Sequence, residues 1–222
     1  MLSRLVERQL EIPGVWSARF FKPAGYSFMA GDYTELELDY EGGGGRRWFS
    51  LSSAPSEKYL QITFKLPQPH SQFKASLMKL NPGDEVQLAP PMGNFNLPIM
   101  PKKVLFIAIG IGATPFRSVM MELDSKNQLA KWDIRMIQAA AKGPVLFDSV
   151  FNKLGGGRQV VGTRPRLTPG VIDGLISDLK ERIIYLAGPE AVTSQLHNQL
   201  ASRMPLSQLR LSYFPGYKSS DS

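Results

Sequence analysis

Apolar and polar residues alternate over several short stretches in the first 98 residues of the chain. The alternation is clearest in YLQITFKL (59–66) and DYTELELDY (32–40). A period of two places successive side chains on opposite faces of a strand, so both stretches are expected to form half-buried antiparallel strands. Further strand-like stretches at 15–21, 47–53 and 84–90 are separated by turn sequences rich in glycine and proline. Such closely spaced strands indicate a small barrel.

One amphipathic helix, at 71–80, interrupts these strands, and the pattern changes near residue 98. From there, apolar runs of strand length alternate with segments of helical period. Strands are expected at 104–110, 133–138, 158–162, 182–187 and 209–214, and helices from 115 onward and at 145–154, 170–181 and 190–203. This alternation is typical of a parallel sheet covered by helices on both faces. We therefore expect two domains, residues 1–98 and 99–222.

The composition is that of a folded protein without a membrane span. Hydrophobic residues make up 43% and charged residues 20% of the 222 residues, which is near the average for globular domains. No apolar run approaches the roughly 18 residues that suggest a membrane helix. The charged N-terminal sequence MLSRLVERQLEIPG lacks the apolar region of a signal peptide. We expect a soluble, cytoplasmic protein.

Net charge and the absence of cysteine narrow the chemistry. Lys and Arg outnumber Asp and Glu by 26 to 19, giving a net charge of +7. The basic residues are spread along the chain, which favours a phosphate-bearing cofactor or an acidic partner over a nucleic-acid surface. Without cysteine there is no disulfide and no cysteine-ligated cluster, so redox chemistry needs an organic cofactor or a metal with other ligands. His70 and His197 stand alone, and no metal site is expected.

The stretch GIGATPFRS follows the first apolar strand of the second half. Gly110 and Gly112 leave room for a phosphate to approach backbone N–H groups, and the next helix directs its positive end at the same place. Thr114 is expected to cap that helix, and Pro115 to take its first position. The third glycine of the G-x-G-x-x-G fingerprint is missing. Taken alone, the loop fits either a phosphate site or a tight turn.

The stretch RRWFSLSSAP, residues 46–55, contains a second candidate site. Arg47, Phe49 and Ser50 offer a cation for a phosphate, an aromatic ring face and a hydroxyl group. This set suits a phosphorylated aromatic cofactor. An ordinary strand with a surface arginine and a core phenylalanine explains the same residues.

The two motifs in this order, followed by YLAGPEAV at 185–192, resemble the ferredoxin–NADP reductase superfamily of flavoproteins. The resemblance extends over essentially the whole chain, with further matches in FMAGDY, in SQFKASLMKLNPGDEVQLAPPMGNF and in the terminal YFPGY. It implies an N-terminal six-stranded antiparallel Greek-key β-barrel that binds FAD. It also implies a C-terminal Rossmann-like domain, a parallel sheet with helices on both faces, that binds NAD(P)H.

The resemblance assigns flavin contacts to the barrel. Arg47 would hold the FAD pyrophosphate, Phe49 would lie against the flavin, and Ser50 would reach flavin N5 as the catalytic residue. The remaining expected contacts lie in the same stretch, in SQFK at 71–74 or in the C-terminal YFPGY: Trp48, Ser71, Phe73, Lys74, Phe214 and Tyr217. Of these, Phe214 and Tyr217 would cover the flavin, and Tyr217 is also expected to be catalytic. The sequence departs from the family where Phe49 replaces tyrosine and where SQFK replaces G-x-x-S.

The resemblance assigns the dinucleotide to the second domain. Its expected contacts lie in two glycine-containing loops: Gly110, Gly112, Thr114, Pro115, Gly188 and Pro189. A serine and an arginine that often bind the extra phosphate of NADP have no clear counterpart, although Lys142, Arg164 and Arg166 follow nearby strands. The choice between NADPH and NADH therefore stays open.

The implied reaction is hydride transfer from nicotinamide to flavin N5, followed by electron transfer to an external acceptor. Aligning two rings needs no general base, which agrees with the lack of a Ser-His-Asp set. The basic balance favours a small acidic carrier such as ferredoxin or flavodoxin. Two alternatives stay open: a flavin reductase that uses flavin as a substrate, and a non-catalytic nucleotide-binding subunit or sensor. The sequence does not specify the direction of electron flow or the oligomeric state.

Overall fold

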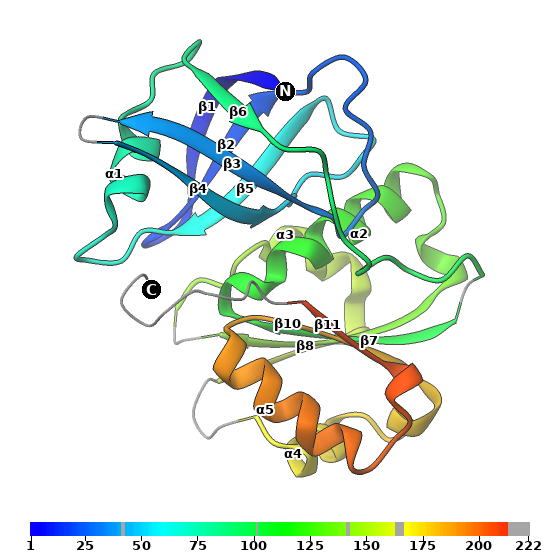
Figure 1. Cartoon of the computed structure of the whole chain (residues 1–222). Helices are drawn as coiled ribbons and strands as arrows, with labels where there is room; N and C mark the ends of the chain where they lie inside the picture. Colours follow the sequence, from blue (N-terminus) through cyan, green and yellow to red (C-terminus); the bar gives the residue numbers. More distant parts are fainter. Residues whose placement is uncertain (41–42, 101, 141–142, 163–166, 213–222) are drawn as a thin grey trace.

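The structure, a computed structural model, describes residues 1–40, 43–100, 102–140, 143–162 and 167–212. The expected flavin-covering residues Phe214 and Tyr217 lie outside these ranges, as do Lys142, Arg164 and Arg166. The chain folds into an antiparallel barrel followed by a parallel α/β unit, and the two lie against each other (Figure 1). The expected two-part fold is confirmed.

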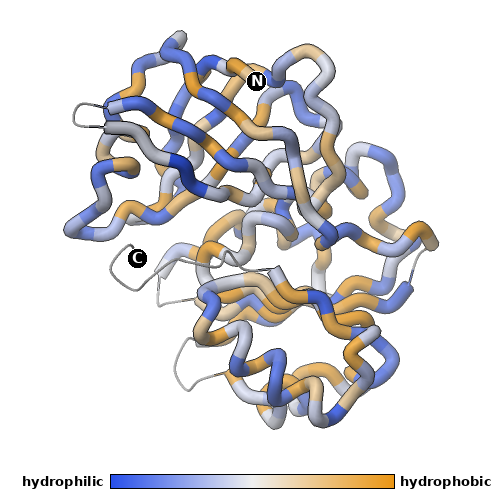
Figure 2. The backbone as a smooth tube through the Cα atoms, in the orientation of Figure 1, coloured by the Kyte–Doolittle hydropathy of each residue, from blue (hydrophilic) through white to orange (hydrophobic). Residues whose placement is uncertain are grey.

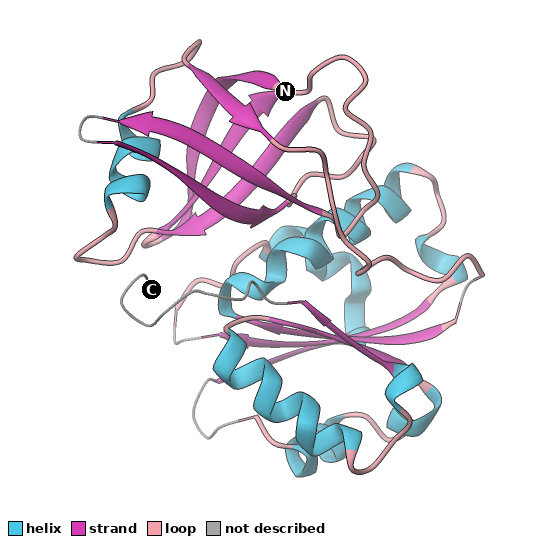
Figure 3. Cartoon of the chain, viewed as in Figure 1, coloured by secondary structure: helices cyan, strands magenta, loops and turns pink. Residues whose placement is uncertain are grey.

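The barrel consists of six antiparallel strands in the spatial order β4-β3-β6-β1-β2-β5. Their bounds are β1 Leu2–Ile12, β2 Val15–Phe21, β3 Tyr33–Tyr40, β4 Gly43–Ser50, β5 Tyr59–Lys65 and β6 Glu85–Leu88. A bridge between Leu51 and Ile62 connects the end of β4 to β5 and so brings the two outer strands together. Helix α1, Gln72–Lys79, covers one end of the barrel (Figure 3). Every second side chain of β3 faces the core, as its period of two predicts.

Two features of the barrel differ from the sequence prediction. The prediction omitted β1, which pairs with both β2 and β6. Charged residues on its exposed face and two register shifts obscure its alternation. The glycine-rich sequence before residue 47 was expected to be a turn between strands, but Gly43, Gly44 and Gly45 belong to β4 and pair with the end of β3. Strand pairing with a neighbour therefore overrides the weak strand preference of glycine.

The α/β unit has five parallel strands in the order β11-β10-β7-β8-β9. Its strands are β7 Lys103–Ile109, β8 Asp133–Ala140, β9 Arg158–Gly162, β10 Ile183–Ala187 and β11 Leu209–Ser212. The helices are α2 Ala113–Ser125, α3 Asp148–Phe151, α4 Pro169–Leu175 and α5 Glu190–Ala201, with short 3-10 turns η1 Gly110–Gly112, η2 Leu129–Lys131, η3 Asn152–Gly157, η4 Leu179–Glu181 and η5 Leu206–Gln208. Helices α2 and α3 cover the face toward the barrel, and α4 and α5 cover the other (Figure 1).

Hydropathy follows this layering. The central parallel strands are continuously apolar, whereas the barrel strands alternate between apolar and polar residues (Figure 2). A sheet covered on both faces needs apolar side chains on both, while a barrel strand needs them only inside. The sequence pattern distinguished the two units for this reason. None of the helices in the described ranges is long and apolar enough to cross a membrane.

The two units share part of one apolar core. Val15 of β2 and Phe95 of the connecting segment belong to the same buried cluster as Phe116 of α2 and Tyr185 of β10. The Phe95 ring lies 5.6 Å from that of Phe116 and 5.1 Å from that of Tyr185, measured between centroids. The Tyr185 hydroxyl also donates to the carbonyl of Asn96 at 2.9 Å. The connecting segment is therefore anchored on the α/β unit.

A buried arginine joins the elements at the amino edge of the parallel sheet. The side chain of Arg182 is 1% exposed and forms a bidentate pair with Asp178 through Nε and Nη2, at 2.7 and 2.8 Å. Its Nη2 also lies 3.0 and 3.1 Å from the two carboxylate oxygens of Asp133. Arg182 also donates to the carbonyl of Val104 on β7. Hydrogen bonds from the Arg182 guanidinium lower the pKa of Asp178. Burial acts in the opposite direction, but the ion pair with Lys103 adds to the lowering, and the pKa falls to about 2.

Candidate functional site

Two glycine-containing loops meet at the carboxyl edge of the parallel sheet. The first runs from the end of β7 through η1 into α2, and the second joins β10 to α5. A Cβ atom placed on Gly112 would lie 2.0 Å from the carbonyl oxygen of Ala187, and one on Gly188 would lie 2.8 Å from the Cβ of Ile109. Only glycines allow the two backbones to approach this closely. The sequence analysis named Gly110, Gly112 and Gly188 for one site, and the structure brings them together.

The reason for the second glycine differs from the one inferred from the sequence. The missing side chain of Gly112 makes room for the backbone of β10 and not for a ligand. At Gly110 the missing side chain points toward the ammonium group of Lys65, 3.6 Å away, and φ is +58°. Gly110 therefore has a left-handed backbone and room beside it. Gly112 is a glycine because its backbone packs directly against that of Ala187.

The start of α2 also differs from the sequence prediction. Thr114 was expected to cap the helix, but α2 begins at Ala113 and Gly112 holds the cap position without a side-chain bond. The Thr114 hydroxyl donates instead to the carbonyl of Ile111 at 3.1 Å. Pro115 was expected at the first helical position and lies at the third, because η1 continues directly into α2. Its missing N–H costs no hydrogen bond there. Both Thr114 and Pro115 are buried, whereas Pro189 is exposed at the start of α5.

Lys65 is a candidate that the sequence analysis missed. It ends strand β5 of the barrel, and its exposed side chain reaches toward Gly110 of the other unit. No ion pair of Lys65 is found within the described ranges, so its charge is available to an anion at the loop. In the sequence it looks like an ordinary polar strand residue. Only the packing of the barrel against η1 gives it a place at this site.

The aromatic motif of the barrel lies on β4 under helix α1. Phe49 is 5% exposed, and its ring stacks on Phe73 of α1 with centroids 6.1 Å apart. Arg47 lies on the same face, with its guanidinium 5.6 Å from the centre of the Phe73 ring. Trp48 points to the other face and packs edge-on against Tyr33. The structure therefore brings Arg47, Phe49 and Phe73 together and sets Trp48 apart from them.

Helix α1 carries the remaining predicted barrel residues. The Ser71 hydroxyl caps it by accepting from the backbone N–H of Lys74 at 3.4 Å. The side chain of Lys74 is buried within the helix packing. Ser71 thus has a structural reason for its position, since a serine cap satisfies an N–H group that the helix leaves unpaired.

These residues fit a flavin phosphate better than they fit a flavin ring. The Arg47 guanidinium donates to the carbonyl of Arg46 at 2.8 Å, and no carboxylate partner for it is found in the described part of the chain. It can therefore receive a phosphate. The Ser50 hydroxyl, on a residue 8% exposed, has no hydrogen-bond partner among the residues that the structure describes. The buried ring of Phe49, by contrast, offers little face to a ligand.

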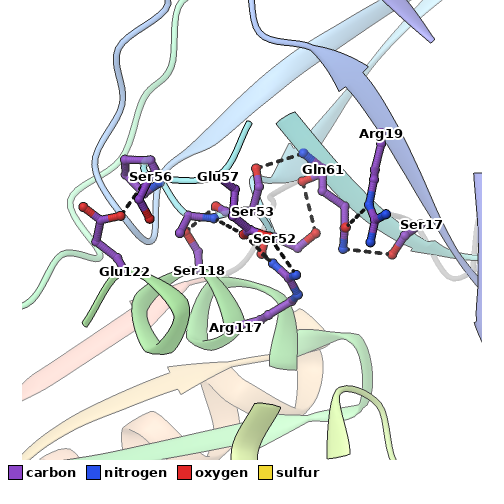
Figure 4. A network of polar contacts seen from close by, with 12 residues as sticks. Ser17, Arg19, Ser52, Ser53, Ser56, Glu57, Gln61, Arg117, Ser118 and Glu122 are labelled. Carbon is purple, nitrogen blue, oxygen red and sulfur yellow. Dashed lines mark hydrogen bonds and ion pairs between the residues drawn. The ribbon is translucent and has the colours of Figure 1, made fainter. Parts of the chain in front are cut away.

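A polar interface holds the loop after β4 against helix α2 (Figure 4). The loop spans residues 51–58 and follows Ser50 directly. The Ser118 hydroxyl donates to the carbonyl of Ser53 at 2.6 Å, and the N–H of Ser56 donates to the Glu122 carboxylate at 2.9 Å. Arg117, between these contacts, reaches the same loop. Helix α2 thus connects the glycine loop at its start to the barrel segment that follows the aromatic motif.

The described residues contain no cluster of three or more His, Asp or Glu side chains that could hold a metal ion. The polar groups at the site are cations, hydroxyls and backbone N–H groups. Such groups suit phosphates and carbonyl oxygens.

No protein-family model matches the chain. It is similar to an NADPH oxidoreductase of Mycobacterium tuberculosis, with 30% identity over 211 aligned residues that cover 88% of this chain and 55% of that protein. It is also similar to a glycine betaine monooxygenase reductase subunit of Chromohalobacter salexigens, with 26% identity over 204 aligned residues that cover 80% of this chain and 55% of that protein. The chain thus spans about half the length of the curated relatives it matches.

Solved structures agree on the fold of both units together. The flavohem-like FAD/NAD-binding domain of a nitric oxide dioxygenase from Vibrio cholerae superposes with a TM-score of 0.79 at 21% identity, covering 96% of this chain and 98% of that one. A ferredoxin–NADP+ reductase from Neisseria gonorrhoeae, solved with bound FAD and NADP, superposes with a TM-score of 0.73 at 17% identity, covering 96% and 97%.

Proposed function

From the premise that this chain has the two-domain fold of the ferredoxin–NADP reductase superfamily, we propose that it is a flavoprotein oxidoreductase. It takes a hydride from NAD(P)H and passes electrons to an external acceptor. One observation carries the proposal: the glycine loops at the carboxyl edge of the parallel sheet face the barrel, where Lys65 and Arg47 present cations. Ligands of open parallel sheets bind at this edge.

The dinucleotide binds to the α/β unit. The positive end of helix α2 favours the negative charge of the dinucleotide phosphates. Lys65 reaches the same loop from the barrel, and it adds a charge-assisted contact. Pro189, exposed at the start of α5, borders the ligand on the other side. Gly112 and Gly188 act indirectly, by allowing the two loops to touch.

The flavin binds to the barrel. Arg47 holds its phosphate, and Ser50, at the end of β4, contacts the ring system through its free hydroxyl. When bound, the flavin supplies a centre that accepts two electrons together and can release them singly. The residues of this chain orient the donor, bring two rings into contact and exclude water. Phe214 and Tyr217 are proposed to cover the flavin.

The acceptor is proposed to be an iron–sulfur or oxygenase partner. The glycine betaine relative is, by its name, a monooxygenase reductase subunit, which supports an acceptor of this class. The sequence contains no cysteine and has a net charge of +7, so a cysteine-ligated cluster has to reside on another segment or protein. An acidic carrier, such as a ferredoxin or a flavodoxin, fits the charge. Its reduction rate should fall with rising ionic strength, and a rate insensitive to salt contradicts electrostatic steering.

Anaerobic titration of the purified protein with NADPH and with NADH tests the proposal. The flavin absorbance should bleach on addition of at least one donor, and the ratio of the two affinities gives the dinucleotide preference. A protein that retains flavin and is bleached by neither donor refutes the oxidoreductase and favours a nucleotide-binding subunit or sensor.

A flavin reductase that releases its flavin is the second candidate, and the aromatic motif favours it. Phe49 is enclosed by Phe73 and contributes to the barrel core, and the residues expected at the flavin pyrophosphate have lost the G-x-x-S pattern. Both features are expected to lower the affinity for flavin. Gel filtration distinguishes the two candidates, since a resident flavin stays with the protein peak and a substrate flavin separates from it.

A further inference from the structure

We propose that Arg117, held by Glu57, is a positioning residue for hydride transfer. It fixes the helix that presents the dinucleotide relative to the barrel segment that carries Ser50. The inference rests on the proposed function, and it adds a residue pair that the sequence motifs did not suggest.

Arg117 of α2 makes three hydrogen bonds to the barrel loop after β4 (Figure 4). Its side chain is 9% exposed and donates to both oxygens of Glu57, at 2.8 and 3.0 Å, and to the carbonyl of Ser52, at 2.6 Å. The guanidinium also lies 5.5 Å from the ring centre of Phe147. A planar group held by three hydrogen bonds and a stacking ring has one orientation. The contact therefore sets an angle between the units as well as a distance.

The loop that Arg117 grips is itself fixed to the barrel. The Glu57 carboxylate accepts from the N–H of Ala54 at 2.6 Å, which closes the loop on itself. The ammonium of Lys22 donates to the carbonyls of Pro55 and Glu57. The Ser52 hydroxyl is bonded to that of Thr63 on β5 at 2.8 Å. A displacement of Arg117 is therefore not absorbed by a flexible loop and reaches the barrel strands.

The charge state of the pair suits a permanent contact. Burial acts to raise the pKa of Glu57, but hydrogen bonds and the charge of Arg117, with the N–H of Ala54, outweigh it and hold the pKa below its ordinary value. Glu57 is therefore ionised throughout the neutral range. Separating the pair is costly, because it leaves the largely buried Arg117 guanidinium without its carboxylate partner.

The position of Arg117 in the chain links this contact to the reaction. It lies two residues after Pro115 on α2, and the loop it grips begins directly after Ser50. Hydride transfer requires the reacting atoms about 3 to 3.5 Å apart, and a 1 Å misplacement can lower the rate about 100-fold. The two ends of the Arg117–Glu57 contact are thus close in sequence to both groups that need alignment.

Arg117→Met and Arg117→Lys, with Glu57→Gln, test this role in the full chain. At a saturating concentration of the donor that bleaches the wild type, stopped-flow bleaching of the flavin should be at least about tenfold slower in Arg117→Met. Arg117→Lys should restore part of the rate, because a lysine keeps the charge but not the planar fork. Glu57→Gln is nearly isosteric and should slow the reaction while folding is preserved.

Flavin content and donor affinity should stay within about twofold of the wild type in these variants, since neither residue is among the proposed flavin and dinucleotide contacts. Arg203→Met is the matched control, because it removes an exposed ion pair with Asp173 far from the interface. It should leave the bleaching rate unchanged.

Two results separate the inference from the function on which it rests. If all three variants bleach at the wild-type rate, with only a lower melting temperature, the pair is structural and the positioning role is refuted. If the wild type retains flavin but is bleached by neither donor, the proposed function itself fails. A doubly substituted Arg117→Met, Glu57→Gln protein should be no slower than Arg117→Met alone, because both changes remove one interaction. Additive losses contradict the pairing.

Discussion

Substituting alanine for Gly112 separates the packing role of this glycine from a ligand-binding role. The backbone at Gly112 has φ −61°, which any residue adopts, so a side chain introduces no conformational strain there. The new Cβ atom would lie 2.0 Å from the carbonyl oxygen of Ala187 and 2.2 Å from its carbon. Even short C···O contacts are about 3.3 Å, so the two loops must move apart by about 1.3 Å.

The expected cost follows from the atoms that have to move. The two atoms belong to the backbone of Ala187, the last residue of β10, which cannot rotate away as a side chain would. Overpacking of this kind costs about 3 kcal/mol, the upper part of the usual range. Gly110→Ala is the matched control: its φ of +58° costs about 1 kcal/mol, but the nearest atom, Nζ of Lys65, is 3.6 Å away. Gly112→Ala should therefore be less stable than Gly110→Ala by about 2 kcal/mol.

Equilibrium unfolding in urea, followed by tryptophan fluorescence without dinucleotide, measures the difference. Gly112→Ala should also bind the donor more weakly, because the loop no longer rests against β10. If Gly112→Ala is as stable as Gly110→Ala and only donor binding is lost, the glycine faces the ligand. The packing explanation is then refuted.

Three further substitutions test individual charges. Arg47→Ala should lower flavin affinity by about 2 kcal/mol, the value of a charged hydrogen bond, measured as flavin retained after dialysis; unchanged retention contradicts the phosphate contact. Lys65→Met should weaken donor binding about tenfold at low salt and less at high salt, whereas equal losses at both indicate a steric effect. The pKa of Asp178 is lowered from 3.8 to about 2 in the folded protein, so as pH falls Asp178 takes up a proton in the unfolded chain before it does so in the folded one. Stability should therefore drop between about pH 4 and pH 2, and Asp178→Asn should flatten that part of the urea-midpoint curve.

The sequence predicted the elements whose signal is local. Alternation located β3 and β5 to within one residue, and apolar runs located the parallel strands, because exposure of a strand face determines its residue types. Strand β1 was missed because charged residues on its exposed face and two register shifts obscure its alternation. The helical segment expected at 145–154 becomes a four-residue α3 followed by η3. Phe147, with a left-handed φ of +58°, directly precedes the start of α3, so a regular helix cannot extend back to residue 145.

The residues of the candidate site likewise include some that the sequence predicted and some that it did not. The glycine loops were recognised because their composition is unusual, and the structure places them in contact. Lys65, Arg117 and Glu57 were not recognised, since each resembles an ordinary surface residue in the sequence. Arg117 and Glu57 are 60 positions apart. They are brought together only by the packing of the barrel against α2, and no local sequence pattern predicts that packing.

The stretch Phe116–Arg117 shows how one helix turn fixes the orientation of both units. The Phe116 ring stacks on Phe106 of β7, with centroids 4.6 Å apart, and meets Phe95 of the connecting segment. Its neighbour Arg117 donates hydrogen bonds to the loop after β4. Apolar packing resists separation of the units but tolerates sliding, whereas the planar ion pair resists sliding. Because both contacts follow Pro115 within two residues, the glycine loop has little freedom to move relative to the barrel. The sequence GIGATPFRS therefore combines the loop that is proposed to bind the dinucleotide with the residues that fix its orientation relative to the barrel.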